Sequence, residues 1–256
     1  ELKIIMALEE ACRIQNKGHK IILMVDLGEW REGILKANIK PYIDAILQLE
    51  YVELYGIGVT FTCINGVIPS QKSMAELTGI KSYIKATYNH NIQITSCGNS
   101  SSYDLIAGDN LPKGVDHIRL GEAILLGRET AYGKKLDDLN QDVFTLKGEI
   151  VEMKSKPTLP IGEIGLDAFG RVPLIKDKGI RKRVLLSFGA QDISLCNLRL
   201  KDNGCEIMGG SSDYVLVDIE GSQETYKLGD HIAFTITYGG VMEVFTSKYI
   251  KKVFVY

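Results

Sequence analysis

The chain has 256 residues, of which 45% are hydrophobic and 24% charged, and its formal net charge is −2. Because 30 basic residues are offset by 32 acidic ones and form no long basic stripe, the composition argues against a nucleic-acid partner. The longest apolar runs, such as Ile21–Val25, are too short to cross a membrane, and five cysteines without a CxxC pair favour reduced thiols in a cytoplasmic protein.

The first half of the chain alternates helix and strand patterns. Apolar residues at helical spacing predict a helix over residues 1–17 that ends at Gly18. Short apolar runs then predict four strands, at Lys20–Asp26, Val52–Gly58, Ile92–Ser96 and His117–Leu120. Further helices are predicted over residues 38–49, after Pro69 to Tyr88, from Ser102 onward and over Glu122–Leu126.

This alternation predicts an α/β fold with a parallel sheet and right-handed crossovers. Four strands are too few to close a TIM-type (β/α) barrel, so we expect a partial barrel that lacks its N-terminal strands. No capping residue precedes the first predicted helix, and Glu1 is not a methionine. Both features agree with a chain that begins inside a longer protein.

From about residue 141 the pattern becomes one of short β-branched or aromatic segments separated by Gly, Asp, Asn and Ser. The predicted strands are Val143–Lys154, Arg183–Phe188, Tyr214–Ile219, His231–Thr237 and Tyr249–Val255. We therefore expect a partial α/β barrel over residues 1–138, followed by an antiparallel β domain over residues 139–256.

Two predicted strand-to-helix turns, Gly98–Ser102 and Arg119–Ala123, carry small polar residues. Free backbone N–H groups and the positive end of a helix dipole make such turns suitable for a phosphate group, and Arg119 adds a permanent cation. Taken singly, the first turn could be a simple helix cap and Arg119 a surface residue. Together the two turns favour a phosphate-binding site.

A charged loop, Val25–Gly33, also follows a predicted strand. In a functional interpretation Asp26 orients a group while Arg31 holds a carboxylate or a phenolate oxygen. The alternative is a solvated surface loop.

The turn Met208–Tyr214 in the second half is by itself a loop with an Asx-type hydrogen bond. Ser212 could serve as a nucleophile, but no histidine lies in a recognisable triad context, which argues against hydrolysis. The histidines also lack metal-ligand spacing, so no metal site is expected.

Five segments resemble the fold-type III pyridoxal-phosphate enzymes, and most closely the alanine/ornithine racemase family. These segments are His19–Gly28, Gly98–Ser102, Arg119–Gly133, Pro160–Gly170 and Gly210–Asp213. The resemblance implies a (β/α)8 barrel that binds pyridoxal 5′-phosphate at its mouth. It also implies a homodimer in which the β domain of the partner subunit closes the site, and a racemase of ornithine or another basic amino acid.

The resemblance also implies roles for individual residues. Asn99 and Ser100 match the loop that touches the cofactor phosphate, with the amides of Gly121 and Glu122 beside it. Arg119 matches the arginine that faces the pyridine nitrogen. A guanidinium there keeps the nitrogen unprotonated, which favours racemisation over side reactions.

Arg31 matches the arginine near the phenolate oxygen and the substrate carboxylate. Tyr249 is the first candidate for a phosphate-side tyrosine, and Tyr238 is the second.

The β domain departs from the alanine racemases, because Ser187–Asp192 stands where they carry a catalytic tyrosine and contains none. Gly209–Asp213 instead resembles the Gly-Pro-Thr-Cys-Asp turn of the basic amino-acid decarboxylases. Ser212 stands at their catalytic cysteine, and Asp213 at the aspartate that pairs with a distal amine. An aspartate there favours ornithine or lysine over alanine as substrate.

No lysine of the chain stands in the context of the family's Schiff-base lysine, which is expected upstream of Glu1. We therefore expect this chain by itself to bind the cofactor weakly and to be inactive. Two alternatives stay open: a non-catalytic pyridoxal-phosphate-binding or regulatory module, and a relative of the basic amino-acid decarboxylases.

Overall fold

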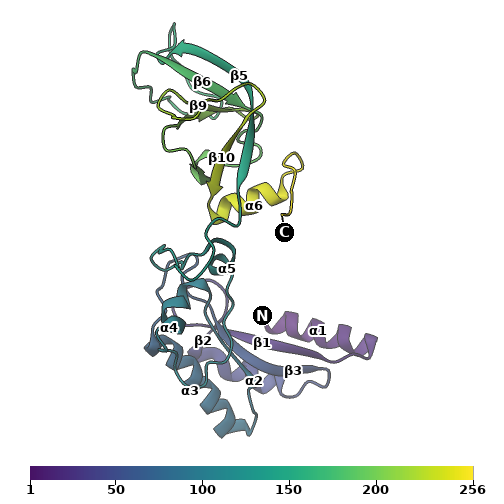
Figure 1. The fold of residues 1–256 in the computed structure, drawn as a ribbon. Coiled ribbons are helices and arrows are strands. Elements are labelled where there is room, and N and C mark those ends of the chain that lie inside the picture. Colours follow the sequence, from purple (N-terminus) through teal and green to yellow (C-terminus); the bar gives the residue numbers. More distant parts are fainter. Residues whose placement is uncertain (256) are drawn as a thin grey trace. The chain divides into compact units, whose positions relative to one another are not determined.

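A computed structural model describes residues 1–255 and separates into two compact units, the first spanning Glu1–Gln141 and the second beginning at Asp142 (Figure 1). Each unit has its own sheet. None of the helices in residues 1–255 is both long and apolar enough to span a membrane.

The first unit contains a parallel four-stranded sheet of order β2-β1-β3-β4 with helices around it (Figure 1). Its strands are β1 (His19–Asp26), β2 (Ile34–Leu35), β3 (Val52–Val59) and β4 (Ile94–Cys97). Its helices are α1 (Leu2–Gln15), α2 (Ile39–Ile46), α3 (Gln71–Tyr88), α4 (Tyr103–Ala107) and α5 (Glu122–Leu126), with short 3-10 turns at Lys36–Asn38 and Ser100–Ser102.

The core of this unit lies where α1, α2 and α3 pack on the central strand β3. Ile57 and Leu77 are fully buried in it, from β3 and α3. Glycine is required in β3, since a Cβ on Gly56 would lie 2.9 Å from the carbonyl oxygen of Ile94 in the neighbouring strand. The parallel sheet and its helices confirm the α/β class, and closure into a barrel stays a prediction.

The predicted strand His117–Leu120 is wrong. Ser96 and His117 form an isolated parallel bridge there, and the N–H groups of Cys97 and Arg119 donate to the carbonyls of His117 and Gly98, but no regular strand forms, and the fourth strand of the sheet is β2 at the other edge. The Ser100 hydroxyl accepts the N–H of Gly121 at 3.1 Å, so the chain turns into α5 instead of extending this pairing.

The second unit is built on a six-stranded antiparallel sheet of order β7-β10-β5-β6-β9-β8, as the strand pattern predicted. Its strands are β5 (Leu146–Pro157), β6 (Ile180–Leu186), β7 (Leu198–Leu200), β8 (Glu206–Gly210), β9 (Val215–Asp218) and β10 (His231–Ile236). A 3-10 turn covers Leu195–Asn197, and helix α6 (Tyr238–Thr246) follows β10. In the core, the rings of Phe188 and Phe234 meet edge to face, with centroids 5.7 Å apart.

The predicted strand Tyr249–Val255 is also wrong, because the chain forms α6 and then an irregular segment. Thr237 caps α6 by accepting the N–H of Gly240 at 3.3 Å. After the helix, the Ser247 hydroxyl accepts the N–H groups of Tyr249 and Ile250, so the backbone turns instead of extending.

Candidate functional site

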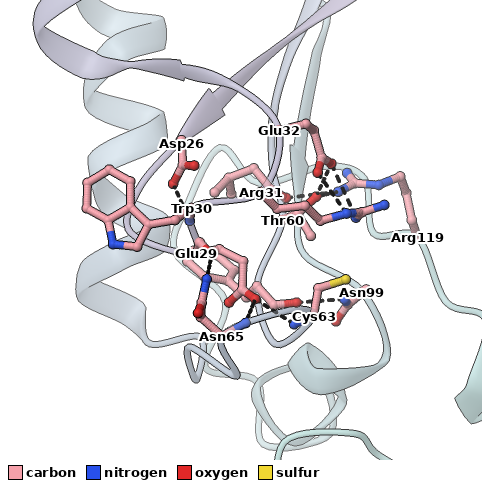
Figure 2. Close-up of polar contacts among 12 residues, drawn as sticks. Asp26, Glu29, Trp30, Arg31, Glu32, Thr60, Cys63, Asn65, Asn99 and Arg119 are labelled. Carbon is pink, nitrogen blue, oxygen red and sulfur yellow. Dashed lines mark hydrogen bonds and ion pairs between the residues drawn. The ribbon is translucent and has the colours of Figure 1, made fainter.

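The candidate site of the first unit lies beyond the carboxyl ends of β1, β3 and β4. Ligands bind at this edge in open parallel sheets and in barrels. Figure 2 shows side chains from the loop after β1, from the end of β3 and from the turn after β4 meeting here.

Arg119 is the cation at the centre of this edge. Its Nη2 donates to the Val59 carbonyl at 2.9 Å and to Thr60 Oγ1 at 3.2 Å, while Nη1 donates to both the carbonyl and the hydroxyl of Ser96. Partial burial lowers the pKa of Arg119, and the nearby Glu32 carboxylate raises it in part. A guanidinium stays protonated under such conditions, so Arg119 is a fixed positive charge held by two strand ends.

Arg31 and Glu32 form an ion pair in the loop after β1, with Nε and Oε2 3.0 Å apart. Glu32 Oε1 also accepts the hydroxyl proton of Thr60 at 2.8 Å. Thr60 therefore lies between Glu32 and Arg119 (Figure 2).

Glu29 joins the loop after β1 to the loop after β3. Its side chain is only 2% exposed, and its carboxylate accepts the N–H groups of Cys63, Asn65 and Val67 at 2.8, 2.8 and 2.9 Å (Figure 2). Burial alone would raise the pKa of Glu29, but these backbone donors outweigh it and lower the pKa. The sequence analysis missed this residue, because nothing local distinguishes it from the other acids of a charged loop.

Asp26 accepts hydrogen bonds from backbone groups of the same loop, the one after β1. Its Oδ1 accepts the N–H groups of Gly28 at 2.8 Å and of Trp30 at 3.2 Å. The structure thus gives Asp26 a turn-forming contact.

Ser100 ties together the two turns that the sequence singled out. Its side chain is buried, and its oxygen accepts the N–H groups of Gly121 at 3.1 Å and of Ala123 at 3.0 Å. The hydroxyl proton remains available to an acceptor. Asn99 supports the turn from inside, since its amide donates to the Phe61 carbonyl at 2.7 Å and its oxygen caps Ser101.

The same turns have donors left for an anion. Within residues 1–255, the N–H groups of Ser100 and Glu122 donate to no protein atom, and the buried hydroxyl of Ser102 has no partner. Gly98 adopts φ +79°, and a Cβ there would lie 2.2 Å from Ser102 Oγ. A buried unpartnered hydroxyl is costly, so these residues fit a bound phosphate group. Burial raises the pKa of the Glu122 carboxyl, which favours its uncharged form beside these turns.

Cys97 is not a nucleophile of this site. It is fully buried at the end of β4, and burial raises its pKa to about 12 despite the nearby Arg119. Among the residues described, no group of three potential metal ligands comes together.

In the second unit, the segments Ser187–Asp192 and Gly209–Asp213 are in contact. The N–H of Ala190 donates to the Ser211 carbonyl at 2.9 Å, and the N–H of Gln191 donates to the Ser212 carbonyl at 3.1 Å. Gly189 is required here, since a Cβ would lie 2.4 Å from the Ser212 carbonyl oxygen. Ser212 Oγ donates to Asp213 Oδ2 at 2.9 Å, and both side chains are exposed in the turn between β8 and β9.

The tyrosine candidates lie elsewhere in the second unit. Tyr238 begins α6, and Tyr249 follows that helix with 78% of its surface exposed. The predicted residues of the first unit, Asn99, Ser100, Arg119, Gly121 and Glu122, are gathered at one edge of its sheet, with Arg31 linked to them through Glu32 and Thr60.

Residues 1–129 match the family model of the alanine racemase N-terminal domain. The chain is 47% identical to an ornithine racemase from Acetoanaerobium sticklandii over 98% of its own length and 72% of that protein. It is 34% identical to a lysine racemase from Thermotoga maritima, covering 96% of this chain and 69% of that one. Its fold is similar to the crystal structure of an alanine racemase from Bartonella henselae with covalently bound pyridoxal phosphate, with a TM-score of 0.64 and 20% identity. That match covers 96% of this chain and 65% of the solved chain, so the chain spans just under two thirds of its length.

Proposed function

The chain belongs to the alanine racemase family, and from this premise we propose that it serves a pyridoxal 5′-phosphate-dependent racemase of ornithine or another basic amino acid. The observation that carries the proposal is the Arg119 guanidinium, held by Val59, at the same sheet edge as the turns of Ser100 and Glu122, whose N–H groups donate to no other atom of residues 1–255. Its relatives named for ornithine and lysine support the substrate class.

In this proposal the turns after β4 and before α5 hold the cofactor phosphate. The Ser100 hydroxyl and the amides of Ser100 and Glu122 donate to it, while Asn99 and Gly121 shape the turn. Pyridoxal phosphate, when bound, supplies an electron sink for the charge left at Cα when a proton is removed. Arg119 would face the ring nitrogen and would keep it unprotonated, since a guanidinium does not readily release a proton.

Other residues bind and discriminate the amino acid. Arg31 pairs with the substrate carboxylate, for which a planar guanidinium is well suited. Asp213 pairs with the distal amine of a diamino acid. Ser212, bonded to Asp213, exchanges a proton on one face of the substrate, and Tyr249 is the proposed tyrosine on the phosphate side. A closed barrel and a homodimer whose partner subunit completes the site belong to the same proposal.

The test is racemisation of ornithine, lysine and alanine by the full-length protein with added pyridoxal 5′-phosphate, followed by chiral chromatography. We expect the basic amino acids to be favoured. We also expect Asp213→Ala to raise the KM for ornithine by about tenfold, as loss of one charged contact implies, with little change for alanine. Equal turnover of alanine and ornithine, or an unchanged ornithine KM in Asp213→Ala, would contradict the proposed substrate class.

The same assay separates the second candidate. The resemblance of Gly209–Asp213 to a decarboxylase turn favours a basic amino-acid decarboxylase, for which ornithine would lose carbon dioxide and yield a diamine. Serine in place of the decarboxylase cysteine at Ser212 argues against it. Binding of the cofactor without turnover would favour a non-catalytic module. Weak cofactor binding by the 256-residue chain alone stays a prediction that this assay also tests.

A further inference from the structure

We propose that Glu32 and Thr60 are positioning residues that fix Arg119 for its contact with the cofactor ring. Neither residue was singled out by the sequence. This inference rests on the proposed function, because it concerns the orientation of the guanidinium that faces the ring nitrogen.

The hydrogen bonds of Thr60 run in one direction, from Arg119 to Glu32. Thr60 has one hydroxyl proton, which it donates to Glu32 Oε1 at 2.8 Å. Its oxygen then accepts the Nη2 proton of Arg119 at 3.2 Å. The chain of donors runs from guanidinium to hydroxyl to carboxylate, and a charged group at each end strengthens both bonds.

Thr60 is buried, whereas the ion pair beside it is exposed. Thr60 is 6% exposed, so water cannot readily replace its two bonds. The Glu32 and Arg31 side chains are 41% and 45% exposed, and an exposed ion pair contributes little to stability. The arrangement is therefore better explained by orientation of Arg119 than by stabilisation of the fold.

One carboxylate, that of Glu32, serves both cations of the proposed site. Glu32 pairs with Arg31 at 3.0 Å and holds Arg119 through Thr60 (Figure 2). Fixing two guanidinium groups before a ligand arrives reduces the entropy lost on binding.

The test compares the affinity of the full-length protein for pyridoxal 5′-phosphate with that for its 1-deaza analogue, in which a CH group replaces the ring nitrogen. Only the ring nitrogen differs, so the ratio of the two dissociation constants reports on the contact with Arg119. We expect the wild-type protein to prefer pyridoxal 5′-phosphate by about tenfold, as expected for one charge-assisted hydrogen bond.

Thr60→Val keeps the shape of the side chain and removes the hydroxyl, so it should lower this preference, while the bonds of Arg119 to Val59 and Ser96 remain. Thr60→Ser keeps the hydroxyl and should restore it. Glu32 is exposed, so Glu32→Ala is not expected to impair folding and should lower the preference in the same way. It therefore tests the inference even if substitution of the buried Thr60 disturbs the fold. The double variant Thr60→Val/Glu32→Ala should lose no more than either single variant, because both act on one relay.

An unchanged ratio in Thr60→Val or Glu32→Ala, or additive losses in the double variant, would overturn this inference while leaving the proposed function intact. A wild-type protein that binds no pyridoxal 5′-phosphate would overturn the proposed function and this inference together. Loss of preference in Thr60→Ser equal to that in Thr60→Val would assign the effect to packing and also overturn the inference.

Discussion

The Glu29 carboxylate and the three N–H groups that it accepts, from Cys63, Asn65 and Val67, form what we call the Glu29 clamp. The clamp allows a specific prediction for the substitution Glu29→Gln. The side chain keeps its length, and its amide oxygen can replace Oε1, which accepts from Cys63 and Asn65. The amide nitrogen then replaces Oε2 and faces the N–H of Val67, so two donors oppose each other.

The cost follows from these contacts. Two bonds to a charged oxygen become bonds to a neutral one, which weakens each by about 0.5–1 kcal/mol, and a third buried donor loses its acceptor at about 1–3 kcal/mol. We therefore expect local opening of this loop to become easier by about 3 kcal/mol. That corresponds to about a hundredfold faster hydrogen exchange at the amides of Cys63, Asn65 and Val67.

Hydrogen exchange resolved by residue measures this effect, and the chain offers a matched control. Glu9 accepts the N–H groups of Glu50, Tyr51 and Val52 at the opposite end of β3. Glu9→Gln should therefore accelerate exchange at residues 50–52 and leave residues 63–67 unchanged. Wild-type exchange rates at residues 63–67 in Glu29→Gln would refute the clamp.

The clamp also has a defined pH dependence. The folded-state pKa of Glu29 is lower than the ordinary value of 4.5, because backbone donors outweigh the effect of burial. Its contribution is complete above the unfolded-state pKa and is lost as the pH falls through the folded-state pKa.

Two further predictions concern the second unit. The pKa of Asp202 is lowered to about 2 by hydrogen bonds from the Ser222 hydroxyl, the Gly204 amide and the Tyr226 hydroxyl, which outweigh the effect of burial. The ionised carboxylate therefore stabilises the folded unit by about 2 kcal/mol above pH 3.8, and this contribution is lost as the pH falls toward 2. In urea unfolding between pH 2 and 6, the free energies of unfolding of wild type and Asp202→Asn should differ by about 1–2 kcal/mol at pH 6 and converge at the acid end. A difference that stays constant over this pH range would contradict the prediction. In Gly189→Ala the new Cβ would lie 2.4 Å from the Ser212 carbonyl oxygen, so the substitution should displace this turn and raise the KM for ornithine. An unchanged KM would show that this turn does not contribute to substrate binding.

Much of the first unit was predictable because its signals are local. Apolar runs identified β1 and β3, and the Ser-rich and Arg-Leu-Gly-Glu turns identified the sheet edge where Ser100 accepts the N–H of Gly121. A serine hydroxyl takes up backbone N–H groups beside both wrong strands. Ser100 accepts the N–H of Gly121 directly after His117–Leu120, and Ser247 accepts those of Tyr249 and Ile250, a competition that β-propensity does not register.

The contacts that the sequence did not predict are long-range. Glu29 accepts from residues 34–38 positions away, and Thr60 reaches Glu32 across 28 positions and Arg119 across 59. Each of these side chains is polar and lies in a loop or at a strand end, where composition alone predicts solvent exposure. Only the folded sheet edge shows that Thr60 contacts both Glu32 and Arg119 and that Glu29 joins the two neighbouring loops.

The most direct test of the account is the fate of the α-hydrogen of ornithine in deuterium oxide, followed by NMR on the full-length protein with pyridoxal 5′-phosphate. A racemase removes and returns this proton, so the account predicts deuterium at Cα in both enantiomers of recovered ornithine, with no diamine formed. Arg119→Ala should suppress the exchange. Ornithine recovered without deuterium, or its conversion to a diamine, would contradict the proposed racemase activity.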